Sequence, residues 1–163
     1  MANTQSMCTS FMSELMYGYH QFGAPTLTSR GSLTAPTNDT FKGALYVTTA
    51  TVNAATTAYS ATNEVTGTNY TAGGVTVTNA TAPTFTNTSV TAGTAYWTPS
   101  ASITYTSVTL STAFDTVLIY NNTQSNKAVS VHTFGSQTVT AGTFTLTMPS
   151  NTTSTALLRL ATV

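Results

Sequence analysis

Threonine dominates this sequence, and charged residues are almost missing from it. Forty-one of the 163 residues are threonine, whereas only eight are Asp, Glu, Lys or Arg. About a quarter of the positions in an ordinary soluble domain are charged, which would be roughly forty residues here. Threonine is β-branched and therefore favours strands, and its hydroxyl keeps the exposed face of a sheet hydrated. The composition therefore predicts a chain built mainly from β-strands.

The charge deficit also excludes several classes of partner. Net charge is zero, so the chain lacks the basic surface that DNA or RNA binding requires. No polybasic run is present to attract anionic lipid, and no apolar run approaches the ~20 residues of a membrane helix. We therefore expect no nucleic-acid partner and no membrane contact. We also expect no secretory signal, and no internal disulfide, because Cys8 is the only cysteine.

A surface so poor in charge has consequences for association. A folded monomer of 17.0 kDa exposes about 7,700 Å² by the surface scaling law, which leaves about one charge per 960 Å². Solubility normally depends on dense mixed charge and a net charge away from zero. The pattern favours a protein whose surface is covered in an assembly, or one that works in an extracellular setting. A monomer that tolerates its low charge is the alternative.

The N-terminal segment differs from the rest of the chain. Apolar residues recur there at spacings of three and four, which predicts one apolar stripe on a helix of about four turns. Gly23 followed by Pro25 is a stop signal for this helix, and residues 24–39 have the composition of a linker. We therefore divide the chain into an N-terminal helix and linker, residues 1–39, and a β domain, residues 40–163. The helix either covers the β core or is an arm that docks on a neighbour. The stripe comprises Met7, Phe11, Met12, Leu15, Met16, Tyr19 and Phe22.

From Thr40 onward the pattern indicates strands. In residues 143–148, for example, Phe144, Leu146 and Met148 alternate with threonine, so we expect these three to face a core. Residues 117–120 form a continuous apolar run typical of a central strand, and the polar residues 121–126 join it to residues 128–132 in a predicted hairpin. A last strand is expected at residues 157–161. We predict seven to nine strands in an antiparallel β-sandwich or jelly-roll-like domain. Its edges carry few charges, which favours pairing with a partner or a second copy.

The sequence contains little that indicates a catalytic or metal-binding site. Asp115 and His132 lie on the two arms of the predicted hairpin, but no nucleophile motif accompanies them. Cys8, His20 and His132 are not spaced as metal ligands, so we expect no metal, no cofactor and no enzyme activity. Tyr96 and Trp97 are a candidate for a sugar-stacking platform, with an aromatic pair in the core as the alternative.

Several stretches resemble a small protein encoded among the virion structural genes of tailed bacteriophages. The similar stretches are Met1–Asn3, Cys8–Phe11, Glu14–Leu15, Asp39–Tyr46, Thr57–Val65, Gly67–Gly74, Val117–Asn121, Asn126–Val129, Phe134–Gly135 and Gly142–Leu146. The resemblance is strongest to capsid decoration, or cement, proteins. It implies a non-enzymatic protein on the outer surface of the capsid, bound to the major capsid protein and often trimeric. A tail or tail-fibre component, including one that binds glycan, is the alternative. The candidate interface residues are Phe11, Met12, Leu15, Met16 and Tyr19.

Overall fold

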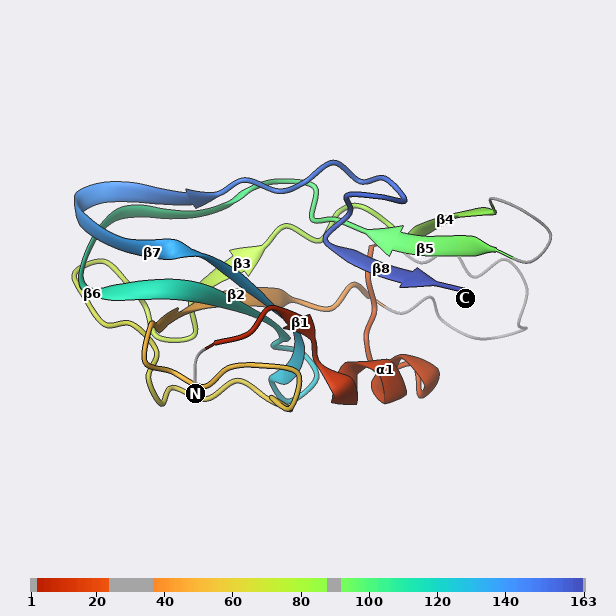
Figure 1. Cartoon of the computed structure of the whole chain (residues 1–163), viewed down its shortest axis with the longest axis horizontal. Helices are drawn as coiled ribbons and strands as arrows, with labels where there is room; N and C mark the ends of the chain where they lie inside the picture. The colour runs from red at the N-terminus through yellow and green to blue at the C-terminus, as the bar shows by residue number, and fades with distance from the viewer. Residues whose placement is uncertain (1–2, 24–36, 88–91, 163) are drawn as a thin grey trace.

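The computed structural model describes residues 3–23, 37–87 and 92–162. In these residues two antiparallel sheets and one short N-terminal helix make up the fold (Figure 1), which confirms the mainly β, sandwich-like architecture expected from the sequence. The larger sheet has the strand order β1-β7-β6-β2-β3, and the smaller one β4-β5-β8. In chain order the elements are β1 (Ser6–Met7), α1 (Thr9–Met16), β2 (Phe41–Val47), β3 (Val75–Val77), β4 (Thr84–Asn87), β5 (Gly93–Trp97), β6 (Ile103–Asn121), β7 (Lys127–Leu146) and β8 (Leu158–Ala161).

A long two-stranded ribbon, formed by β6 and β7, is the framework of the molecule. The strands contain 19 and 20 residues and pair antiparallel with several shifts of register. Such bulges bend a ribbon, and at the left of Figure 1 both strands fold back over themselves. Phe134 and Phe144 of β7 consequently meet with their ring centroids 5.3 Å apart. The folded ribbon therefore supplies two layers that face each other across the core.

The predicted central strand and hairpin are both present. Residues 117–120 lie within β6, between β2 and β7, and all four side chains are buried. The polar turn that follows leads directly into β7. A run that is apolar at every position fits here, because this part of the sheet is covered on both faces.

Alternation decides which residues enter the core near the end of the ribbon. Phe144, Leu146 and Met148 pack against the core, while the threonines between them are exposed. This is the arrangement that the sequence pattern predicts for a strand with one solvent-exposed face. The closing strand also appears, as β8.

The N-terminal helix is much shorter than the apolar pattern predicts. Helix α1 has eight residues, about two turns, and ends at the C-cap Tyr17. Gly18 follows with a φ of 73°, a left-handed conformation that glycine adopts without the steric cost met by other residues. The prediction that the helix continues to Gly23 is therefore wrong. Pro25 and most of the predicted linker, residues 24–36, lie outside the described residues.

The described part of the N-terminal segment packs on the β core. Strand β1 joins the edge of β7, and the side chains of Cys8, Phe11 and Phe22 are core members. The ring of Phe22 stacks on Phe41 of β2 at a centroid distance of 4.6 Å. Burial raises the pKa of the Cys8 thiol to about 12, so it stays protonated near pH 7 and acts as a small apolar side chain.

Candidate functional site

The apolar stripe of the N-terminal helix is divided between the core and the surface. Phe11 is buried and Leu15 is partly buried against the core, whereas Met12, Met16 and Tyr19 are 48%, 89% and 45% exposed. Because α1 ends at Met16, Tyr19 no longer lies on the helical face where the pattern placed it. Of the five candidate interface residues, Met12, Met16 and Tyr19 are thus the ones that a partner can reach most fully.

The small sheet presents a second apolar group close to the helix. Phe85 of β4 pairs with Ala95 of β5, which pairs with Leu160 of β8. Residues in register across a sheet point to the same face, so these three side chains form one row. Phe85 is 70% exposed and Leu160 is 44% exposed. The row therefore continues the inner face of the small sheet beyond the part that covers the core.

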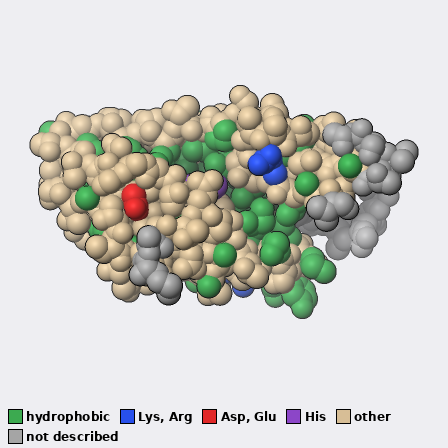
Figure 2. Space-filling model, in the orientation of Figure 1, with side chains coloured by type: hydrophobic (Ala, Val, Ile, Leu, Met, Phe, Trp, Pro, Cys, Tyr) green, Lys and Arg blue, Asp and Glu red, His purple; other side chains and the backbone are tan. Residues whose placement is uncertain are grey.

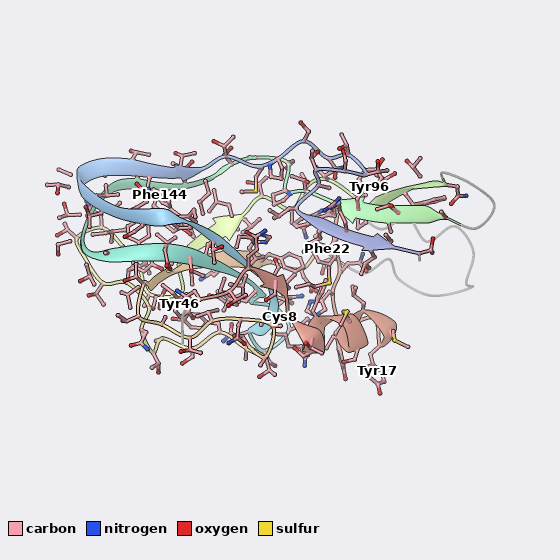
Figure 3. All side chains as sticks on the ribbon, viewed as in Figure 1. Cys8, Tyr17, Phe22, Tyr46, Tyr96 and Phe144 are labelled. Atoms are coloured by element: carbon pink, nitrogen blue, oxygen red, sulfur yellow. The ribbon has the colours of Figure 1, made fainter. Side chains whose placement is uncertain are left out.

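A shallow cavity of about 80 Å³ connects the helix to this row. Its lining is almost entirely apolar and includes Phe11 and Leu15 on one side and Ala95 and Leu160 on the other. In Figure 2 hydrophobic side chains gather on this part of the molecule. Tyr17, which is 78% exposed, points away from the body of the protein in Figure 3.

We call the exposed group the apical apolar surface. It consists of Met12, Met16, Tyr17, Tyr19, Phe85 and Leu160, the exposed large hydrophobic residues of the described chain. Taking ~200 Å² for each such side chain, their exposed fractions leave about 750 Å² of apolar area at this end. That is close to the ~800 Å² that one partner contributes to a specific interface of ordinary size. Large apolar side chains exposed in such numbers favour an interaction site in this part of the molecule.

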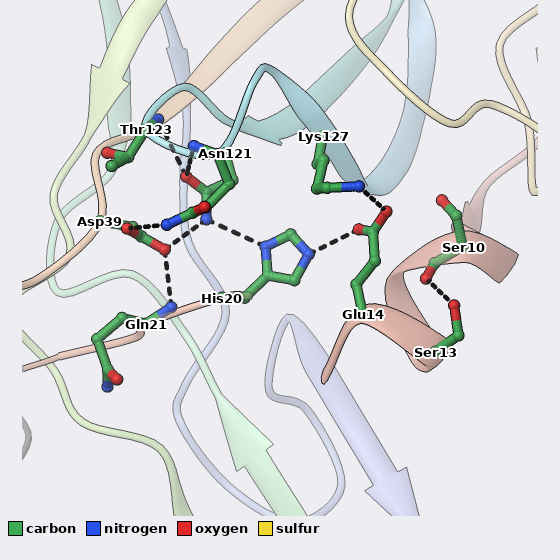
Figure 4. Close-up of polar contacts among 10 residues, drawn as sticks. Ser10, Ser13, Glu14, His20, Gln21, Asp39, Asn121, Thr123 and Lys127 are labelled. Carbon is green, nitrogen blue, oxygen red and sulfur yellow. Dashed lines mark hydrogen bonds and ion pairs between the residues drawn. The ribbon is translucent and has the colours of Figure 1, made fainter. Parts of the chain in front are cut away.

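A buried polar network holds the helix against the ribbon (Figure 4). The Glu14 carboxylate accepts a hydrogen bond from His20 Nε2 at 2.8 Å and pairs with Lys127 Nζ at 2.7 Å. Asn121 Nδ2 lies 3.1 Å from His20 Nδ1 and donates to Asp39 Oδ2 at 2.7 Å. Side chains from α1, the segment after it, β6 and β7 are therefore tied together beneath the apical apolar surface.

The network fixes the protonation state of His20. Asn121 Oδ1 accepts hydrogen bonds from the backbone N–H groups of Thr123 and Gln124, so the Nδ2 amino group of Asn121 must face His20 as a donor. His20 Nδ1 is then an acceptor, and Nε2 carries the proton that goes to Glu14. Burial lowers the pKa of His20 below its usual value, in spite of the neighbouring carboxylates. The imidazole is therefore neutral near pH 7.

Glu14 is held in its charged form by its partners. Burial alone would raise the pKa of this carboxyl, but the hydrogen bonds from Lys127 and His20 outweigh it and lower the pKa. The ammonium of Lys127 also lies 5.2 Å from the centre of the Tyr19 ring, a cation–π contact. The ion pair thus orients an exposed aromatic residue of the apical apolar surface.

The predicted aromatic platform is not formed by Tyr96 and Trp97 together. Neighbours in a strand point to opposite faces. Trp97 is 2% exposed, its Nε1 donates to the Thr81 carbonyl oxygen at 2.7 Å, and its ring packs against Phe22 at 4.7 Å. Its face is consequently covered by the core, and only Tyr96 of the pair remains accessible.

The residues considered for catalysis have other partners. Asp115 Oδ1 accepts hydrogen bonds from Asn3 Nδ2 and Thr116 Oγ1, each at 2.8 Å. His132 Nε2 lies 2.8 Å from Ser130 Oγ, and Ser130 is buried. No cluster of three or more His, Cys, Asp or Glu side chains suited to a metal ion occurs among the described residues.

One polar site was missed by the sequence reasoning. The buried Glu64 carboxylate accepts hydrogen bonds from Tyr59 Oη at 2.6 Å, Tyr70 Oη at 2.7 Å and the Gly73 N–H at 2.8 Å. Burial raises the pKa of both tyrosines, so they remain donors. All four residues lie in the long connection between β2 and β3, so the site holds that connection together, and Tyr70 Oη also accepts the N–H of Leu45 in β2. The sequence did contain a signal for this site: Glu64 has no basic residue near it in the sequence and is flanked by Tyr59 and Tyr70.

The comparisons with known proteins add no relative. No family model, no curated protein and no solved structure matches this chain. None of the helices in the described ranges is long and apolar enough to cross a membrane. The indications of function therefore come from the chain's own surface and from the resemblance noted in its sequence.

Proposed function

We propose that this protein is a non-enzymatic structural component of a tailed-phage virion, and specifically a decoration protein of the capsid. In this role it binds the major capsid protein on the outer surface of the assembled head and stabilises the shell. We further propose that it acts as a homotrimer. Because it binds only the assembled form, each bound copy favours that form by mass action.

The apical apolar surface is the observation that carries the proposal. It comprises about 750 Å² of exposed apolar side chains on α1, on the segment directly after it and on the small sheet, elements that lie toward the same end of the molecule in Figure 1. Leaving this area in water is unfavourable, and covering it on a partner recovers the hydrophobic free energy. The neutral, threonine-rich remainder of the chain supports the same role, because copies with little charge can crowd on a shell without mutual repulsion.

The last residue of α1 and its C-cap, Met16 and Tyr17, allow a direct test. Met16→Ser with Tyr17→Ser removes the two most exposed side chains of the apical apolar surface without touching the core. We expect binding to purified heads that lack this protein to weaken at least about tenfold, as loss of central interface residues does. Co-sedimentation with the heads measures the binding. Gln137→Ser with Thr138→Ser, at exposed positions of β7, is the matched control and should bind like the unmodified protein.

The outcomes separate the docking surface from the virion role. Circular dichroism should show that both double variants fold. If the Met16 and Tyr17 variant binds heads normally, the apical apolar surface is not the docking site. Electron cryomicroscopy of complete particles then tests the role itself: density in many copies on the shell supports it, whereas density only at the tail or fibres rejects it in favour of a tail component.

A further inference from the structure

A second cavity lies between the two layers of the folded β6–β7 ribbon. Its volume is about 130 Å³, and it shares no lining residue with the cavity beside α1. Ile103 and Leu146 line it from one half of the ribbon, and Val117, Ile119 and Phe134 from the other half. The proposed docking role does not use this cavity.

One imidazole side chain lines the cavity and can form hydrogen bonds with a ligand. His132 lines it, together with mainly apolar side chains. Its Nε2 is engaged by the hydroxyl of Ser130 at 2.8 Å, while its Nδ1 has no hydrogen-bond partner among the described residues. A serine hydroxyl can donate or accept, so the imidazole can adopt either tautomer. His132 Nδ1 can therefore accept a hydrogen bond from a ligand or donate one to it.

The electrostatic environment selects a neutral ligand. Burial lowers the pKa of His132 to about 4, so the ring is uncharged near pH 7. None of the residues that line the cavity is charged. A carboxylate or an ammonium group would lose its hydration there without gaining a counter-ion, which is strongly unfavourable.

Size and chemistry together define the ligand. Apolar cavities of about 150 Å³ accept a single benzene ring, and this one is only slightly smaller and open to one side. We propose that it binds a small, neutral, ring-sized molecule with one hydroxyl or N–H group, phenol being the simplest example. The ring packs among the aliphatic side chains, and the polar group forms a hydrogen bond with His132 Nδ1.

Nuclear magnetic resonance of methyl groups tests the proposal on the unmodified protein. Phenol should shift the methyl signals of Ile103, Leu146 and Met148 with a Kd on the order of 1 mM, as expected for seven non-hydrogen atoms. Toluene, which lacks the hydroxyl, should bind about three- to tenfold more weakly, because one neutral hydrogen bond is lost. Benzoate should not bind. Equal affinities for phenol and toluene, or shifts confined to Met12 and Met16, would overturn the proposal.

Two variants and one further ligand sharpen the result. His132→Leu should reduce phenol affinity to that of toluene and leave toluene binding unchanged, whereas Gln137→Leu, an exposed change on the same strand, should alter neither. If His132→Leu does not fold, the comparison of phenol with toluene still decides the question. N-acetyltyrosinamide should bind more weakly than phenol. Equal binding would mean that the cavity receives a tyrosine side chain of a partner protein, and the proposed small molecule would be rejected.

Discussion

Asn121→Leu should destabilise this protein by about 3 kcal/mol, although leucine has the same branched skeleton of side-chain heavy atoms as asparagine. Asn121 is fully buried at the centre of the network below α1. Its Nδ2 group serves His20 and Asp39, and its Oδ1 accepts two backbone N–H groups of the β6–β7 turn. Leucine fills the space but satisfies none of these groups. The cost is therefore one of lost hydrogen bonds rather than of a cavity.

The magnitude follows from which groups can find water. The two turn amides belong to Thr123 and Gln124, which are not fully buried, so water replaces Asn121 there at little cost. His20 and Asp39 are both buried. A buried neutral acceptor left without a donor costs roughly 1 kcal/mol, and a charged one roughly 2 kcal/mol. Asp39 keeps the N–H of Gln21 as a donor, so the total stays near 3 kcal/mol.

Urea unfolding followed by tryptophan fluorescence is the assay. The chain has a single tryptophan, and Trp97 is buried, so its emission reports the loss of the core. Asn122→Leu is the matched control: this neighbour is exposed, and its replacement should change the free energy of unfolding by less than about 0.5 kcal/mol. Amide exchange in α1 should accelerate only in Asn121→Leu. A loss below about 1 kcal/mol, or equal losses in both variants, would refute the anchoring role of the network.

Two further predictions concern a pair of glycines and acid pH. Gly74 and Gly18 have φ values of 70° and 73°, but a Cβ on Gly74 would collide with the backbone of Gly43, whereas one on Gly18 meets open space. Gly74→Ala should therefore prevent folding, which circular dichroism can show. Gly18→Ala should lower the free energy of unfolding by only about 1 kcal/mol, which urea titration can measure. Burial lowers the pKa of His132 to about 4, while the unfolded chain takes up this proton near pH 6.5. Stability should therefore fall as the pH drops from 7 to 5, by up to about 2 kcal/mol from this residue, and His132→Gln should reduce the fall. A free energy of unfolding that is the same at pH 7 and pH 5 would contradict this.

The strands were predictable because their signal is local. Alternation of Phe144 and Leu146 with threonine, and the unbroken apolar run 117–120, depend only on which face of a strand is covered, and the structure confirms both. The length of the N-terminal helix could not be predicted from such a local signal. The apolar spacing continues past Met16, but the conformation of Gly18 ends the helix, and Phe22 then enters the core from a segment without regular secondary structure. Spacing alone cannot distinguish these two ways of burying an aromatic ring.

The site was predictable only in part, for a related reason. The sequence pointed to the stripe that includes Met12 and Met16, which the structure leaves exposed. It gave no indication that Phe85 and Leu160 would stand in one row, because that row depends on the register of β5 with β8, strands separated by about sixty residues. Burial of Trp97 likewise depends on Phe22, which reaches it from outside the β domain that the sequence delimits.

The location of the few charges supports the proposal that an apolar surface carries association. Glu14, Asp39 and Glu64 are buried, and Lys127 is paired with Glu14, so much of the small complement of charge works inside the molecule as hydrogen-bonding anchors. The outer surface of the described chain is accordingly more neutral than the composition suggests. A surface with so little charge cannot select a partner by long-range attraction, and salt cannot screen an attraction that is absent. Contact area and shape must then supply both affinity and specificity. The described chain concentrates its exposed large hydrophobic side chains on α1, on the segment directly after it and on the small sheet, with the buried network directly beneath to hold that end in place.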